Sequence, residues 1–314
     1  MYYAKTLRHL SLEDSKKVGG KAASLSCLCR HNFNVPDGIV VTTEAFKDFM
    51  ISLDLKQKIK SILNTINLNI PHTLESASLD IKKLIMDSKI PNEIAESIMS
   101  QFSYLGLGNV AVRSSATVED GLDHAWAGQL ESFLNVERWD ILNKLKLCWA
   151  SLYGPRAIHY GLRSGFGSDI AVAVIIQNMI FAEKAGVAFS VHPISEDENM
   201  MLIEANYGLG ESVVSGMVTP DSYGLLKDNF QIIEEVINHK NKSVYPKDGG
   251  GSEWIELPYN IANSRVLSKE NITSIAKAVK DIEIMSGYAC DVEWAIKDEI
   301  LYILQSRPIT TIKT

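Results

Sequence analysis

The sequence of 314 residues has few cysteines, no excess of basic charge and no long apolar run. A formal net charge of −7 argues against a broad surface for nucleic acid or anionic membranes. The most apolar stretch, Ile170 to Ile176, is too short to span a bilayer, and the first residues lack a signal-peptide pattern. With this charge, any phosphate binding is expected to be local. No Cys-x-x-Cys spacing occurs, so we expect reduced thiols and a cytoplasmic location; the cysteines are Cys27, Cys29, Cys148 and Cys290.

The distribution of apolar residues predicts an α+β protein. Residues 52–105 and 139–163 read as helices, and Ser268 to Ser286 predicts an amphipathic helix that begins at a serine cap. From Ile170 onward the sequence becomes rich in strands. Near-continuous apolar runs there are typical of strands in a sheet that is covered on both faces; they are 171–180, 186–190 and 201–206.

Two alternating segments near the C-terminus predict a β-hairpin. We expect a three-residue loop, Asp298-Glu299-Ile300, and that register places Glu293 across from Gln305 and Asp291 across from Arg307. A two-residue loop separates Glu293 from Gln305 in a regular hairpin. Simple alternation places one set of the second strand's side chains on one face; the set is Leu301, Ile303, Gln305 and Arg307.

This hairpin has the donor types of a metal and polyphosphate site. A carboxylate beside an amide oxygen suits a hydrated Mg²⁺ that also takes phosphate oxygens. The guanidinium of Arg307 is suited to bind phosphate through two hydrogen bonds. The alternative is a surface hairpin whose glutamate and arginine are merely exposed.

Two earlier motifs also carry phosphate-binding residue types. Gly19 and Gly20 precede a helical pattern, so first-turn N–H groups and the Lys21 ammonium can meet an anion. The alternative is a glycine turn with a solvated lysine. Arg113 lies at the end of a predicted strand, in Val-Arg-Ser-Ser-Ala-Thr, where it can grip phosphate or instead pair with Glu119 or Asp120.

Six motifs in this order resemble one known family over residues 18 to 308. The motifs are Gly-Gly-Lys, Val-Arg-Ser-Ser-Ala-Thr-x-Glu-Asp, Ala-Gly-Gln, Val-x-x-Ile-Gln-x-Met, Ile-Glu-Ala-Asn-Tyr-Gly-Leu-Gly-Glu, and Asp-Val-Glu-Trp-Ala followed by Leu-Gln-Ser-Arg-Pro. The family is the nucleotide-binding domain of phosphoenolpyruvate synthase, pyruvate phosphate dikinase and rifampin phosphotransferase. The resemblance implies an ATP-grasp fold whose two α+β lobes, residues 1–165 and 166–314, clamp ATP.

The resemblance also implies roles for individual residues. Lys21, Arg113 and Arg307 would bind phosphates, and Glu293 and Gln305 would hold Mg²⁺. The adenine edge would be framed by Gln177, Met179 and Ile180. The ribose or the metal-bound phosphates would meet Glu204 and Glu211. A lid loop over the phosphates would contain Gly128 and Gln129.

The implied reaction cleaves ATP to AMP and phosphate and transfers a phosphoryl or pyrophosphoryl group. In the family the acceptor is a histidine on a swivelling domain, and a third domain passes the group on. None of the seven histidines here has the expected glycine-rich context, so we expect a partner domain or protein to supply it. The lid region departs from the family pattern, and these departures bear on lid dynamics or acceptor choice; they are Gly121, Leu122, His124, Ala125 and Trp126.

Two other functions stay open at this stage. One is a self-sufficient small-molecule kinase or ATP-grasp ligase with an acceptor pocket near His124 and Trp126, although His124 also reads as an ordinary exposed loop histidine. The other is a nucleotide sensor without turnover. Retention of the phosphate cations together with the metal-ligand pair argues against the sensor.

Overall fold

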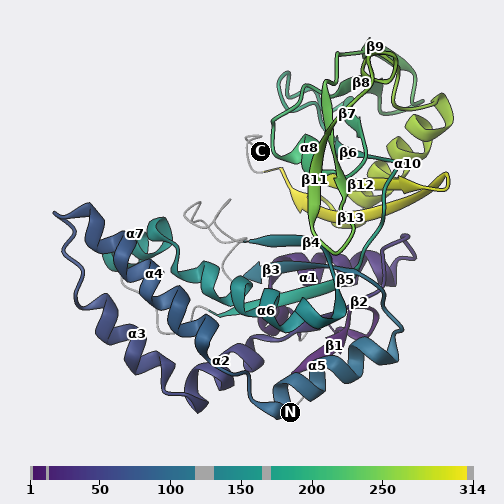
Figure 1. The fold of residues 1–314 in the computed structure, drawn as a ribbon. Helices are drawn as coiled ribbons and strands as arrows, with labels where there is room; N and C mark the ends of the chain where they lie inside the picture. The colour runs from purple at the N-terminus through teal and green to yellow at the C-terminus, as the bar shows by residue number, and fades with distance from the viewer. Residues whose placement is uncertain (1–2, 12–13, 117–130, 165–170, 310–314) are drawn as a thin grey trace. The chain divides into compact units, whose positions relative to one another are not determined.

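The computed structural model describes residues 3–11, 14–116, 131–164 and 171–309, whose contacts form two compact units (Figure 1). Unit 1 comprises Met1–Ser26 and Asp37–Met179, and unit 2 comprises Cys27–Pro36 and Ile180–Thr314. Each unit combines helices with an antiparallel sheet, as the α+β prediction requires. The predicted second lobe begins at residue 166, whereas the strand Val172–Asn178 belongs to the sheet of unit 1.

Unit 1 is built on a five-stranded antiparallel sheet in the part of the chain that the structure describes. The strand order is β1-β2-β5-β3-β4, with bounds Ala4–Thr6, Gly38–Val41, Val172–Asn178, Val110–Ala116 and Ser132–Val136. β5 is the central strand, paired with β2 and β3. Its apolar run predicted a strand correctly, but hydrophobicity alone does not indicate which sheet a strand joins.

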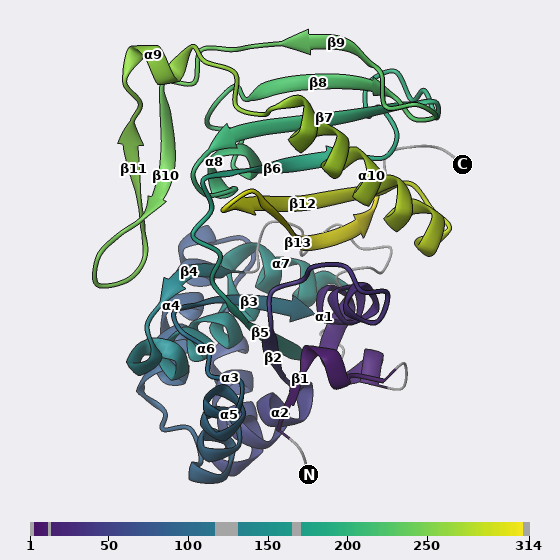
Figure 2. The ribbon, with the colours of Figure 1, turned by 90° about the vertical axis from the view of Figure 1, so that its right-hand side faces the viewer.

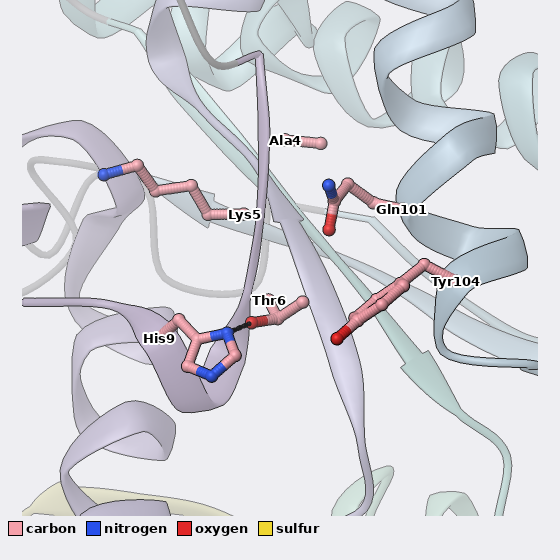
Figure 3. A pocket seen from close by; sticks show the side chains of 6 residues that line it. All are labelled: Ala4, Lys5, Thr6, His9, Gln101 and Tyr104. Atoms are coloured by element: carbon pink, nitrogen blue, oxygen red, sulfur yellow. Dashed lines mark hydrogen bonds between the residues drawn. The ribbon is translucent and has the colours of Figure 1, made fainter.

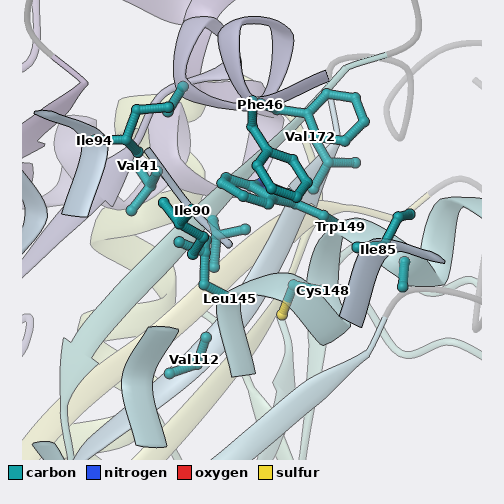
Figure 4. Close-up of a cluster of buried hydrophobic side chains, with 14 of the residues drawn as sticks. Val41, Phe46, Ile85, Ile90, Ile94, Val112, Leu145, Cys148, Trp149 and Val172 are labelled. Carbon is teal, nitrogen blue, oxygen red and sulfur yellow. The ribbon is translucent and has the colours of Figure 1, made fainter. Parts of the chain in front are cut away.

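Helices cover both faces of this sheet. One face packs on a large apolar cluster that includes Phe46, Leu145 and Trp149 (Figure 4). Within it Trp149 stacks on Phe49 at 4.9 Å between ring centroids. The helices and 3₁₀ turns of that side are α2 Thr43–Ser52, α3 Leu55–Leu63, α4 Pro71–Asp87, α5 Asn92–Tyr104, η4 Arg138–Asp140, α6 Ile141–Ala150, η5 Ser151–Tyr153 and α7 Pro155–Ser164. The opposite face receives the start of α1, Ser15–Arg30, and η1, Leu7–His9, joins β1 to it.

Unit 2 is built on a six-stranded antiparallel sheet within the described residues (Figure 2). The order is β13-β12-β6-β7-β8-β9, with bounds Ile300–Pro308, Cys290–Lys297, Lys184–Phe189, Met200–Tyr207, Asp221–Leu226 and Ile232–Val236. The backbone carbonyl of Asn34 accepts from the Ile303 amide and its side chain donates to the Leu301 carbonyl, so the segment Cys27–Pro36 is bonded to β13 through Asn34.

Helix α10, Lys269–Ser286, covers one face of the unit 2 sheet. Its predicted serine cap is confirmed, because Ser268 accepts from the Asn271 amide and Asn271 bonds back. A separate hairpin, β10 Lys242–Pro246 with β11 Ser252–Glu256, and short helices α8 Glu211–Val214 and α9 Tyr259–Ala262 complete the unit. Among the described helices, none is long and apolar enough to cross a membrane.

A buried ion pair joins β8 to the chain that follows β9. The side chains of Lys240 and Asp221 are fully buried, with Nζ and Oδ1 at 2.5 Å. The other Asp221 oxygen accepts from the Val266 amide and the Tyr223 hydroxyl, so both charges have several partners. A charge pair satisfied in this way tolerates burial, whereas either charge alone does not.

Candidate functional site

The Gly-Gly-Lys motif forms a loop that packs against the end of β3. Gly19 interrupts α1 with φ of 74° and ψ of 168°, so the helix restarts at Gly20 and Lys21 lies in its first turn. The Ser115 hydroxyl donates to the Val18 carbonyl at 2.7 Å and accepts from the Ala22 amide at 3.2 Å. Strand β3 therefore holds this loop on both sides of its glycines.

Arg113 and Gln177 lie on the same sheet face as that loop. Arg113 and Ser115 are two residues apart in β3 and so project to one side. Gln177 of β5 pairs with Ala111, which belongs to the same alternating set, and its side chain is buried. Lys21 and Arg113 are half-buried. Arg113 and Gln177 therefore lie on the face of the unit 1 sheet against which the glycine loop packs, and Lys21 belongs to the first turn after that loop.

The segment predicted to frame adenine runs across the end of β5, with Gln177 in the strand and Met179 and Ile180 just after it. Met179 is buried and donates its backbone N–H to the Asn109 carbonyl at 2.9 Å, so this N–H is engaged within unit 1. The carbonyl of Ile180 accepts from the Ala182 amide at 2.9 Å. The segment crosses the boundary between the units, since unit 1 ends at Met179 and unit 2 continues from Ile180. These contacts do not test an adenine role, which stays a prediction.

The pairing predicted for the C-terminal hairpin is confirmed. Glu293 of β12 lies directly across from Gln305 of β13, and the Gln305 amide donates to Glu293 Oε1 at 3.2 Å. Asp291 lies across from Arg307, whose Nε and Nη2 donate to Asp291 Oδ2 at 2.8 and 2.7 Å. An amide turns over easily, so Gln305 can present its oxygen in place of its NH₂ group. The two pairs lie side by side on one face.

The loop that produces this pairing is shorter than predicted. Lys297 pairs with Ile300, so the turn has two residues, Asp298 and Glu299, with φ of 51° and 57°. A β-bulge then shifts the register between Glu293 and Trp294, and Leu304 is the extra residue. The expected three-residue loop is therefore wrong, and the bulge restores the pairing that a two-residue turn alone would break.

The bulge also changes which side chains share a face. Ile303 pairs with Trp294, and both are buried on the side that α10 covers. Gln305 and Arg307 pair with Glu293 and Asp291 on the other side. The prediction that Leu301 and Ile303 share a face with Gln305 and Arg307 is wrong, because the extra residue reverses the alternation.

A third carboxylate belongs to the same face. Glu293 pairs with Val187 of β6, and Val187 pairs with Glu204 of β7, which places Glu204 in the same row across the sheet. Burial raises the pKa of Glu204, and the Asp291 charge raises it further. Burial likewise raises the pKa of Asp291, although Arg307 opposes that shift. The face therefore concentrates negative charge in a partly desolvated place.

The second predicted glutamate lies away from this row. Glu211 begins α8 and is exposed, and its carboxylate accepts from the Ser252 hydroxyl of β11 at 3.1 Å. The turn before it is fixed by Gly208, whose φ is 68° and where an added Cβ would lie 2.3 Å from the Val244 carbonyl. Glu211 thus contacts the β10–β11 hairpin, and its nucleotide role stays a prediction.

The donor set of this face fits a hard cation. Asp291 Oδ1 is buried and has no hydrogen-bond partner in the described residues, while Oδ2 is held by Arg307. The described residues contain no cluster of three or more Asp, Glu, His and Cys side chains that could hold a metal ion. A cation at Glu293 and Gln305 would therefore need further oxygens from water and phosphate, as Mg²⁺ at nucleotide sites does.

Some predicted features lie outside the part of the chain that the structure describes. Gly128 and Gln129 of the expected lid loop do so, as do His124 and Trp126. A pocket of about 350 Å³ lies elsewhere in unit 1, on β1, η1 and α5, and none of the predicted residues lines it (Figure 3). Thr6 and His9 hydrogen-bond to each other at its edge.

Sequence reasoning missed the contact made by Ser115. The hydroxyl stands within the Val-Arg-Ser-Ser motif, but its partners Val18 and Ala22 lie 97 and 93 residues earlier. No local pattern connects residues at that separation. The sequence indicated the position of Asp291 opposite Arg307 but assigned it no role in the site.

Residues 15–314 match the family model described as pyruvate phosphate dikinase, AMP/ATP-binding domain. The chain belongs to this family. It is 38% identical to the probable phosphoenolpyruvate synthase of Methanothermobacter thermautotrophicus, over 99% of this chain and 46% of the relative. Identity is 41% to the same kind of protein from Archaeoglobus fulgidus, over 98% and 41%. For the rifampicin phosphotransferase of Bacillus cereus it is 35%, over 94% and 34%.

The chain spans less than half the length of each of these three relatives. Family membership therefore identifies a nucleotide-binding domain of a phosphotransferase family. Superposition on the D-alanine–D-alanine ligase of Bacillus anthracis gives a TM-score of 0.35 at 11% identity, with 94% of this chain and 57% of the ligase covered. That similarity is too low to assign a fold.

Proposed function

We propose that this chain is the ATP- and Mg²⁺-dependent part of a phosphotransferase that uses a histidine on a partner domain or protein. It would cleave ATP to AMP and phosphate and transfer a phosphoryl or pyrophosphoryl group to that histidine. The observation that carries the proposal is the two neighbouring cross-strand pairs on the β12–β13 hairpin of unit 2, Glu293 with Gln305 and Asp291 with Arg307. The names of the similar proteins support the same reaction class.

The proposal includes an ATP-grasp fold in which one ATP contacts residues of both units. Lys21 and Arg113 from unit 1 and Arg307 from unit 2 would bind its phosphates. Their positive charges neutralise the charge that develops on the transferring oxygens, which is the main catalytic task in phosphoryl transfer. We also propose a cytoplasmic location, where ATP is abundant and the four free cysteines remain reduced.

Glu293 and Gln305 would hold Mg²⁺, which when bound supplies Lewis-acid stabilisation of the phosphate oxygens. The raised pKa values of Glu204 and Asp291 support this assignment, because both carboxylates lie where a cation would relieve their repulsion. Perturbed carboxylates concentrate at functional sites for this reason. Arg307 holds one oxygen of Asp291 and thereby orients the carboxylate beside Glu293.

The remaining predicted contacts belong to the nucleoside and to a loop. Gln177, Met179 and Ile180 would frame adenine. Glu204 and Glu211 would meet the ribose or the metal-bound phosphates, and Gly128 and Gln129 would cover the phosphates.

In the proposed step a histidine nitrogen attacks the β-phosphorus of ATP. The N–P bond forms as the bond from that phosphorus to the bridging oxygen of the α-phosphate breaks, and AMP leaves with the electron pair. The β- and γ-phosphates then reside on the partner. Water releases the γ-phosphate as inorganic phosphate, which leaves the β-phosphate on the histidine.

The test is incubation of the purified chain with Mg²⁺ and ATP labelled separately at the β and γ positions, with and without an extract of the source cells. We expect AMP, γ-label in phosphate and acid-labile β-label on an extract protein. Turnover without extract would instead favour the self-sufficient kinase or ligase. Tight ATP binding without turnover in either mixture would favour a sensor.

A matched pair of variants makes this test specific to the site. Arg307 and Lys297 both lie on the β12–β13 hairpin and both pair with a carboxylate. Arg307→Ala should lower β-label transfer at least tenfold, since it removes a phosphate cation. Lys297→Ala should leave transfer within about twofold, because its exposed ion pair contributes little. Equal losses in both variants would contradict the assignment.

A further inference from the structure

The Ser115 hydroxyl occupies a special place in the Gly-Gly-Lys loop. After Gly19 the helix restarts, so Ala22 lies in its first turn, where backbone N–H groups lack partners within the helix. In an ordinary helix the side chain of the residue before the first turn accepts from such an N–H. Gly19 has no side chain, and Ser115 accepts from the Ala22 amide instead at 3.2 Å.

The same hydroxyl also secures the chain before the glycines. It donates to the Val18 carbonyl at 2.7 Å, and Val18, Ala22 and Ser115 are each at most 1% exposed. One oxygen thus connects the last residue before the loop with the first turn after it. Neither backbone group has access to water, so loss of the hydroxyl would force the loop to move or leave both groups unsatisfied.

Gly19 leaves the space that this arrangement needs. A Cβ at Gly19 would lie 2.4 Å from the Ser115 carbonyl oxygen and 2.6 Å from its hydroxyl oxygen. Its φ of 74° is also unfavourable for a residue with a side chain. A serine or aspartate at this position could therefore not cap the helix itself while the loop stays against β3.

We propose that Ser115 is a positioning residue of the nucleotide site, which caps the helix after Gly19 from the neighbouring strand and so fixes Lys21 for phosphate. Lys21 lies between Gly19 and Ala22, so the two hydrogen bonds of the Ser115 hydroxyl, to Val18 and from Ala22, fix the backbone on both sides of Lys21. This inference rests on the proposed function for the identity of the ligand. It assigns no contact between Ser115 and ATP itself.

The test is a double-mutant cycle of Ser115→Ala and Lys21→Ala, with ATP and adenosine affinities measured by calorimetry. Ser115→Ala should weaken ATP binding about tenfold and adenosine binding less than twofold, because only ATP has phosphates for Lys21. In the Lys21→Ala background the same substitution should have little further effect. Additive effects would overturn the inference, since residues that act through one another are not additive.

Amide exchange provides a readout that needs no ligand. In the free protein the Ala22 amide should exchange slowly, and Ser115→Ala should accelerate it at least tenfold while strands β2 and β5 keep their protection. An unchanged Ala22 rate overturns the inference whatever the ATP result. If the wild-type chain binds no ATP, the proposed function fails, and the exchange rates still decide whether Ser115 holds the loop.

Two further variants separate positioning from general stability. Ser151→Ala removes another buried hydroxyl of unit 1, which donates to the Cys148 carbonyl at 2.7 Å. It should leave ATP affinity and Ala22 exchange unchanged. If Ser115→Ala does not fold, Ser115→Cys retains a weak donor and acceptor of similar size and takes its place in the cycle.

Discussion

At the scale of single residues, the candidate site places three carboxylates on one sheet face where water is limited. Asp291 and Glu293 are two residues apart on one face of β12, and Glu204 lies in the same row. Burial raises the pKa of Asp291 and of Glu204, and in each case a neighbouring carboxylate adds to the shift. An arrangement that raises carboxylate pKa values destabilises the free protein at neutral pH, and a bound cation would remove that penalty.

Glu204 makes this testable through pH. Its pKa is raised above the ordinary 4.5, so the folded state holds the proton more tightly than the unfolded state. The contribution of the protonated Glu204 to the free energy of unfolding is therefore complete below about pH 4.5 and is lost as pH rises through the folded pKa. Glu204→Gln should match the wild type in stability at pH 4 and exceed it at pH 7, by urea unfolding without nucleotide or Mg²⁺.

Glu270 provides a control with the opposite sign. It lies in the first turn of α10, where backbone and Ser268 hydrogen bonds lower its pKa. Its favourable contribution is present above 4.5 and is lost as pH falls through the folded pKa. Glu270→Gln should thus be less stable than the wild type at pH 7. A stability gain in both variants at pH 7 would point to a general charge effect and contradict the Glu204 prediction.

At the scale of elements, the β12–β13 hairpin shows what the sequence could and could not indicate. Alternation located both strands, and Glu293 pairs with Gln305 as predicted, although the three-residue loop from which that pairing was predicted is wrong. The turn length was not predictable from the pattern, because Asp298-Glu299 is not a strong two-residue turn signal. The bulge at Leu304 has no sequence signature of its own. The turn is one residue shorter than predicted and the bulge adds one residue, so the predicted pairing of Glu293 with Gln305 is unchanged.

The two turn residues carry conformational strain that can be relieved. Asp298 has φ of 51°, where glycine is favoured, and its exposed ion pair with Lys297 is weak. Asp298→Gly should raise the free energy of unfolding by up to about 1 kcal/mol. Glu299→Gly should gain less or lose stability, because Glu299 accepts from Asn271 at 2.9 Å and pairs with Lys184. Equal gains in urea unfolding would contradict this account of the turn.

Other elements followed local signals more directly. The α10 boundaries were predictable because a serine cap and an apolar face of helical period both lie within the segment. The place of β5 was not, since it pairs with β2 and β3, which are encoded far from it in the sequence. The hydrogen bonds of Ser115 to Val18 and from Ala22 were not predictable either, because these residues are also far apart in the sequence. Local chemistry predicts elements and residue types, and long-range contacts decide which of them meet.

At the scale of the whole molecule, the predicted nucleotide residues divide between the two compact units. Unit 1 contains Lys21, Arg113 and Gln177, and unit 2 contains the row with Glu293, Gln305 and Arg307. Each group alone offers only part of what an ATP–Mg²⁺ complex requires: unit 1 has cations beside a glycine loop, and unit 2 has hard oxygen donors with one guanidinium. A single ATP that uses both groups would couple the stability of the units.

This coupling can be measured by hydrogen exchange in a core element of each unit. Helix α6 of unit 1 contains the buried Trp149, and strand β12 of unit 2 contains the buried Trp294. ATP with Mg²⁺ at about a hundred times its Kd should stabilise the folded state by about 2.7 kcal/mol. We expect slower exchange in both elements, since release of either unit would break contacts to the same ligand.

Variants on the two units show whether one ligand is responsible. Arg113→Ala removes a cation from unit 1, and Gln305→Ala removes a metal-ligand candidate from unit 2. Each variant should reduce the ATP-dependent protection of both α6 and β12, because each weakens binding of the shared ligand. Protection confined to one unit, or a variant that affects only its own unit, would mean that ATP binds a single unit. The phosphate cations of unit 1 and the metal-ligand pair of unit 2 would then serve different ligands.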